Sequence, residues 1–74
     1  MLIVENAAGQ VVAIEVKSTT SPTGQDFRSM KILAEALGDR FLRGFLFHTG
    51  KEDLPFGSKL RALPIQSLWA PRKG

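Results

Sequence analysis

Two short apolar segments on either side of the turn Asn6-Ala7-Ala8-Gly9 open the chain and indicate a β-hairpin. Strands are predicted over residues 2–5 and 11–17. A three-residue loop that ends with Gly9 in the left-handed conformation would join them. The resulting register sets Met1 opposite Glu15 on one face of the hairpin. A register shifted by one residue would reverse the faces, so this pairing is a specific prediction.

The middle of the chain changes to a helical period. We predict a helix over residues 24–37, because Thr23 and Asp26 have the spacing of a capping box and Gly38 is a natural stop. The apolar stripe that would face a sheet consists of Phe27, Met30, Leu33, Ala34 and Leu37.

The second half of the chain returns to strands. Residues 41–47 are apolar on both faces, as in the central strand of a sheet that is covered on two sides. After a polar loop at 49–53, a short strand is predicted over 60–63 and a helical turn over 64–69. A helical crossover makes the third strand parallel to the second. The order β-β-α-β-β predicts an α/β (α+β) fold with a small mixed sheet and one main helix.

One helix cannot cover both faces of such a sheet. Either the second face stays exposed or another chain covers it, and we expect a partner because large exposed apolar patches mark interaction surfaces. That partner is either a second copy of the chain, which makes a homo-oligomer, or a larger protein. The domain is expected to span residues 1–69, followed by a flexible basic tail at 70–74.

The length and composition of the chain exclude several classes of protein. A chain of 74 residues forms a single domain at most, and the absence of cysteine excludes disulfides, thiolate metal sites and cysteine nucleophiles. No apolar run approaches the roughly 18 residues of a membrane span, and no secretion signal is evident, so we expect a cytoplasmic protein without membrane contact. A net charge of +3 weakly favours polyanionic partners, DNA or RNA.

The candidate chemistry lies at the end of the second predicted strand. Glu15 and Lys17 are two residues apart and therefore point to the same face. A carboxylate and an ammonium in this E-x-K spacing suit a metal-dependent phosphodiesterase, in which the acid holds a divalent cation and the lysine orients or activates the attacking water. The plainer alternative is a salt bridge at a strand end, worth about 0–1 kcal/mol when exposed.

Several segments, in order, resemble a known domain family. They are residues 9–18 (GQVVAIEVKS), 26–28 (DFR), 33–41 (LAEALGDRF), 49–50 (TG), 54–57 (LPFG) and 62–65 (ALPI). Together they resemble the uncharacterised domain at the C-terminal end of a bacterial and archaeal family of predicted AAA+ ATPases. The resemblance covers nearly the whole chain and implies a partial restriction-endonuclease-like core of the PD-(D/E)xK nuclease superfamily.

The resemblance implies roles for both charged residues. Glu15 matches the metal-binding acid and Lys17 the motif lysine. The position of the aspartate that completes the metal site falls at Met1 or just before it, and a methionine thioether is not a ligand that Mg²⁺ chooses. Glu5, about 13 Å further along the strand, is a poor substitute. We therefore expect weak Mg²⁺ binding and no catalysis by this chain alone, which looks like a detached, truncated piece of a larger protein. It has no phosphate-loop motif, so we expect no ATP binding.

Other polar residues are candidates for binding without catalysis. A nucleic-acid-binding set would comprise Lys17, Ser18, Arg28 and Lys31. His48 has no cysteine or second histidine to share a metal, so we expect a structural histidine rather than a catalytic one. The aromatic residues do not interleave with basic residues as a base-stacking platform would.

Three functions remain open at this point. The first is a truncated nuclease-like domain that acts through self-association or partner binding. The second is a Mg²⁺-dependent nuclease whose missing acid comes from a second copy, and the third is a nucleic-acid-binding module.

Overall fold

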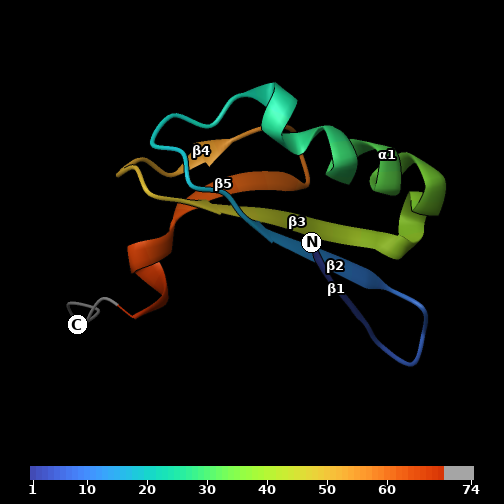
Figure 1. The fold of residues 1–74 in the computed structure, drawn as a ribbon. Coiled ribbons are helices and arrows are strands. Elements are labelled where there is room, and N and C mark those ends of the chain that lie inside the picture. Colours follow the sequence, from blue (N-terminus) through green and yellow to red (C-terminus); the bar gives the residue numbers. More distant parts are fainter. Residues whose placement is uncertain (70–74) are drawn as a thin grey trace.

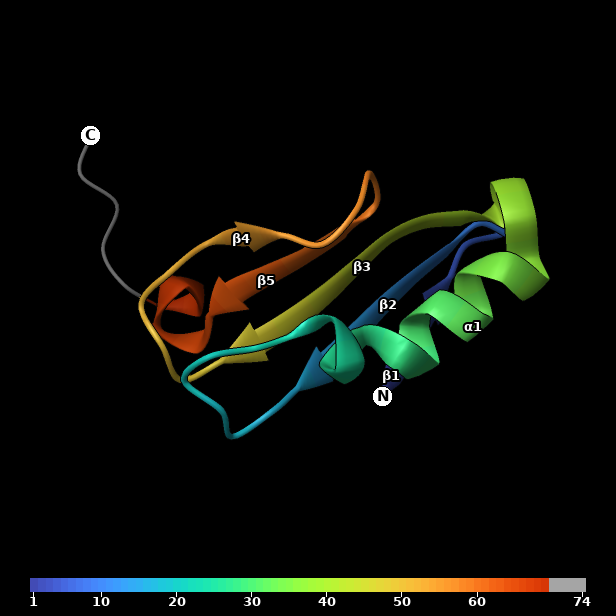
Figure 2. The same cartoon turned by 90° about the horizontal axis from the view of Figure 1, so that it is seen from above.

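Within residues 1–69, five strands form one mixed sheet, and one main helix lies along it (Figures 1 and 2). The computed structural model describes residues 1–69, so the tail predicted at 70–74 lies outside the described residues. The strands are β1 (Leu2–Glu5), β2 (Val11–Val16), β3 (Phe41–His48), β4 (Leu54–Pro55) and β5 (Leu60–Pro64), and their order in the sheet is β1-β2-β3-β5-β4. The helical elements are η1 (Gly24–Phe27), α1 (Arg28–Leu37), η2 (Gly38–Arg40) and η3 (Ile65–Leu68). The α/β mixed fold expected from the sequence is confirmed.

The β1–β2 hairpin has the predicted register. Leu2 pairs with Ile14 and Glu5 with Val11, so the same register sets Met1 opposite Glu15. Gly9 adopts a positive φ of 81° at the end of the loop, as expected for this closure. The hairpin is also tied to the rest of the fold, because Arg40 Nε donates to the Gly9 carbonyl over 2.9 Å.

The helix begins where the sequence predicts, but its first turn is a 3₁₀ turn. Asp26 Oδ2 accepts a hydrogen bond from the Thr23 N–H at 2.8 Å, and the Asp26 N–H donates to the Thr23 carbonyl at 3.0 Å. These bonds close a tight turn, and tight turns at helix ends commonly have 3₁₀ geometry. Gly38 ends the helix with a φ of 57°, in the region that favours glycine.

The core lies between α1 and one face of the sheet, which we call the helix face. Gly44 permits the close approach, because a Cβ at this position would lie 2.8 Å from the Met30 sulfur. The Phe27 ring stacks on the Phe56 ring with centroids 4.7 Å apart and so extends the core toward β4. The buried core residues are Ala13, Phe27, Met30, Phe41, Leu46, Leu60 and Ala62.

Strands β2, β3 and β5 are parallel, and β3 is the central strand, as predicted. A shift in the β2–β3 register lets Val11 pair with Phe41 while Val12 pairs with Arg43, which makes Leu42 an extra residue in β3. This bulge keeps both Phe41 and Gly44 on the helix face. Strand β4 was not predicted; it has two residues, too few to show a period, and is recognised only by its antiparallel pairing with β5.

Within residues 1–69, no long helix covers the second face of the sheet, which we call the open face. The short turn η3 lies on this side, near one end of the sheet (Figure 1). No helix within residues 1–69 has the length and apolar character needed to cross a membrane.

Candidate functional site

Glu15 and Lys17 lie together at the end of β2, on the helix face. Their side chains form an ion pair, with Lys17 Nζ 3.7 Å from Glu15 Oε2. Strand alternation places them on the same side as the buried Ala13. The Glu15 side chain is 21% exposed and that of Lys17 is 40% exposed, so the pair borders the core and still reaches solvent. The sequence prediction that both point to one face is confirmed.

One oxygen of the Glu15 carboxylate lacks a hydrogen-bond partner within residues 1–69. This oxygen is Oε1, which is buried. Buried polar atoms are paired in nearly all folded proteins, so an orphaned carboxylate oxygen marks a place where a cation, a water or a partner's donor would be stabilised.

The side chains around Glu15 do not form a complete magnesium site. Among residues 1–69 no three side chains of the types His, Cys, Asp and Glu gather as metal ligands. The hairpin register leaves Met1 as the residue opposite Glu15, and the Lys17 ammonium beside the carboxylate repels a cation. Mg²⁺ requires several hard oxygen ligands, so this donor set does not fit the ion without a further acid.

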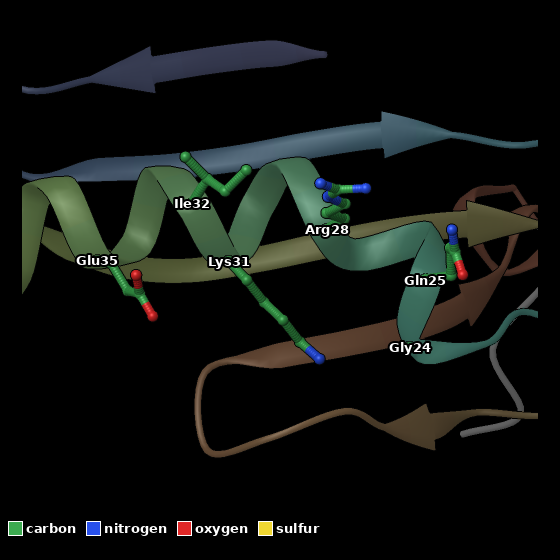
Figure 3. Close-up of a pocket in the computed structure, with 6 residues that line it drawn as sticks. All are labelled: Gly24, Gln25, Arg28, Lys31, Ile32 and Glu35. Atoms are coloured by element: carbon green, nitrogen blue, oxygen red, sulfur yellow. The ribbon is translucent and has the colours of Figure 1, made fainter.

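The predicted nucleic-acid set is only partly brought together. Lys17 and Ser18 are adjacent at the end of β2, and Arg28 lies on the flank of α1 that faces β2 (Figure 3). Lys31 points from the opposite flank, toward β5, together with Glu35 (Figure 3). Both flanks line one open groove of about 490 Å³. Within residues 1–69, Arg28 and Lys31 line this same groove along α1, and neither Lys17 nor Ser18 lines it. Arg28, Lys31 and Glu35 all border this groove, so it carries both positive and negative charge.

His48 is a fully buried structural residue, as predicted. Its Nδ1 accepts a hydrogen bond from the Gly50 N–H at 3.0 Å, and its Nε2 lies 2.8 Å from the Glu52 carbonyl oxygen. A carbonyl only accepts, so Nε2 carries the proton and the ring is the neutral Nε2–H tautomer. Both ring nitrogens are thus used to hold the loop that follows β3.

The loops after β2 and β3 meet beside this histidine. The Thr49 N–H donates to the Thr19 carbonyl at 2.9 Å. Gly50 packs so closely that a Cβ there would lie 2.2 Å from the Thr20 carbonyl oxygen. These loops stand at the carboxyl ends of parallel strands, where open α/β sheets place their ligand sites.

A basic cluster on the open face, which contains Arg43 and Arg61, was not predicted from the sequence. Arg61 of β5 pairs directly with Phe45 of β3, and Arg43 is two residues before Phe45 on the same strand. Arg43 and Phe45 are therefore neighbours on this face, and Arg61, which lies far from both along the chain, joins them there. The only sequence signal was the segment Arg43-Gly44-Phe45, which by itself is indistinguishable from a central strand.

Comparison with known proteins gives a family without an assigned function. The family model described as "Domain of unknown function (DUF4143)" matches residues 2–68. Neither the search of curated proteins nor the search of solved structures found a match.

Proposed function

Given that this chain belongs to the DUF4143 family, we propose that the domain acts by association, and that a second copy of the chain covers its open face. Kinship with the PD-(D/E)xK nuclease fold, and with the C-terminal domains of AAA+ ATPases, is part of the same proposal. The antiparallel β1–β2 hairpin, the E-x-K pair at the end of β2 and the helical crossover to a parallel β3 support that kinship.

The observation that supports association is an apolar patch on the open face. The patch consists of Leu2, Val4, Val12, Ile14 and Val16. Strand alternation and the β1–β2 register put these residues on one side of the sheet. Leu2 and Val16 are each 61% exposed and Val4 is 51% exposed. A contiguous exposed apolar surface of this kind usually marks an interaction site.

The distribution of charge favours a second copy as the occupant. The apolar patch contains no charged residue, whereas Arg43 and Arg61 lie on the β3–β5 half of the same face. Two sheets can pack face to face at a separation of about 10 Å with their apolar sides interdigitated. A two-fold axis over the patch would pack apolar surface against apolar surface and leave the arginines at the rim, where solvent separates like charges.

The variant Val16→Lys tests this association. An ammonium placed inside an apolar interface costs about 2 kcal/mol, so we expect the dimer dissociation constant to rise by about 30-fold. Light scattering and sedimentation at micromolar concentrations would measure the change. Ile32→Lys is the matched control, because Ile32 has the same 61% exposure but lies on α1, on the other side of the molecule. A wild-type chain that remains monomeric, or an equal effect of both variants, would contradict the proposal.

A second candidate function is metal-dependent cleavage of a phosphodiester, with a further acid supplied by another copy. The orphaned Oε1 of Glu15, beside Lys17, favours it. A divalent cation there would supply electrophilic stabilisation of the phosphate. Within one chain, Glu15 would contribute one oxygen ligand and Lys17 a point charge for the phosphate.

Manganese titration tests this second candidate. This candidate requires Mn²⁺ to broaden the backbone amide signals of Glu15 and Lys17 in a saturable manner, with the further acid coming from a second copy of the chain. It also requires Glu15→Gln to lose the saturable component, because the amide lacks the negative charge. Glu35→Gln, on the exposed flank of α1, is the control and should leave the titration unchanged. Broadening that grows in proportion to the Mn²⁺ concentration without saturation would remove support for a metal site.

A further inference from the structure

We propose that Arg43, Lys59 and Arg61 form a binding site for a phosphate group at the β3–β5 end of the open face. A cavity of about 160 Å³ is present there, and its lining residues are Arg43, Phe45, Gly57, Ser58, Lys59, Leu60 and Arg61. Pockets for drug-sized ligands begin at about 300 Å³, whereas a water occupies about 30 Å³ of liquid. The cavity is therefore of a size for one small polar group rather than for a large ligand.

Three separate elements bring the cations together. The bulge at Leu42 turns Arg43 and Phe45 toward the open face, because Gly44 between them faces Met30. Arg61 pairs across the sheet with Phe45, and Lys59 lies at the end of the β4–β5 connection. No local segment contains all three cations, so the parallel pairing of β3 with β5 creates the site.

Each cation is held in place by a bond that leaves further donors available. Lys59 Nζ donates to the Phe41 carbonyl at 2.9 Å, and Arg43 Nη1 donates to the Leu42 carbonyl at 3.0 Å. Arg61 donates from Nε to Asp53 Oδ1 at 2.6 Å, which leaves its two terminal amino groups. Cations that are anchored in this way lose less side-chain entropy when they bind an anion.

The charge of the cavity selects an oxyanion. Three cationic side chains line it and no carboxylate does, while Asp53 offsets part of the charge of Arg61 from outside. Two guanidinium groups offer planar pairs of donors, which match the oxygens of phosphate. The half-buried Phe45 lines the same cavity and provides an aromatic surface for a base attached to that phosphate. The site is separate from Glu15 and Lys17, which lie on the helix face at the opposite ends of the strands.

Titration with inorganic phosphate at low ionic strength tests the site. We expect saturable shifts of the Ser58 and Lys59 amide signals and of the Arg43 and Arg61 Nε–H signals. Arg43→Gln is expected to weaken binding by about tenfold or more, because it removes charge-assisted hydrogen bonds. This variant leaves the Arg61–Asp53 pair intact, so it should fold normally.

Lys51→Gln is the control, since it also removes one positive charge, and Lys51 is an exposed residue in the loop after β3 that does not line the cavity. Saturable shifts that Arg43→Gln weakens and Lys51→Gln leaves unchanged support the site. Shifts that do not saturate, or that persist fully in Arg43→Gln, overturn it.

A second arm of the experiment identifies the source of the phosphate. Single-stranded oligothymidylate is added to both variants and followed by fluorescence anisotropy at several salt concentrations. Binding that falls steeply with salt, and is lost in Arg43→Gln, assigns the phosphate to a nucleic-acid strand. Phosphate binding without oligothymidylate binding assigns it to a small phosphorylated ligand. Both results support the site and differ only in what occupies it.

Discussion

Replacement of His48 by alanine is expected to lower the free energy of unfolding by about 4 kcal/mol. The substitution removes the acceptor of the Gly50 N–H and the donor to the Glu52 carbonyl, and each buried group left unpaired costs about 1–3 kcal/mol. It also leaves a cavity where a fully buried ring had packed. A domain of 74 residues is stabilised by about 4–11 kcal/mol in total, so this loss would remove at least about a third of that stability.

Denaturation with urea measures this loss, with His48→Asn as the comparison. The asparagine Oδ1 can still accept from the Gly50 N–H, so we expect His48→Asn to retain part of the stability that His48→Ala loses. The unfolding curves should be recorded at several protein concentrations, because the stability of an associating chain depends on concentration. Equal stability of His48→Ala and the wild type would show that the two hydrogen bonds do not hold the loop.

Replacement of Gly50 by alanine is expected to cost about 3 kcal/mol, the second largest effect. The added Cβ would lie 2.2 Å from the Thr20 carbonyl oxygen. Overpacking typically costs about 1–3 kcal/mol, and here the obstacle is backbone rather than the end of a flexible side chain, which argues for the upper end. The loops after β2 and β3 would have to separate, which would also strain the bond from Thr49 to Thr19.

Gly24→Ala is the matched control for this prediction. Gly24 has no positive φ, and the nearest atom to an added Cβ is the Lys31 Nζ at 3.7 Å, an ordinary contact. The free energy of unfolding of Gly24→Ala should stay within about 1 kcal/mol of the wild type. If chemical denaturation showed Gly50→Ala to be as stable as Gly24→Ala, the close contact between the two loops would be wrong. Because Gly50 also donates to His48, the effects of changing both residues should not add.

Much of the fold follows from neighbouring residues. The hairpin register was predictable because the loop length and the Gly9 conformation fix it within ten residues of chain. The helix boundaries follow from the Thr23–Asp26 cap and from Gly38. The shared face of Glu15 and Lys17 follows from strand alternation alone. The sequence thus determined the strands β1, β2, β3 and β5, the main helix, the order of these elements along the chain and the pair of charges at the end of β2.

The tertiary structure decided which distant side chains meet. One extra residue, Leu42, reverses the alternation within β3, so that His48 faces the helix and Arg43 the open face. The partners of His48, the contact of Gly50 with Thr20, and the meeting of Arg43 with Lys59 and Arg61 all depend on that register. Strand alternation and helix capping depend on residues that are close together in the chain, so both can be predicted from the sequence. The register of parallel strands that are joined by a crossover depends on how the whole core packs, so it cannot be predicted from a local sequence pattern.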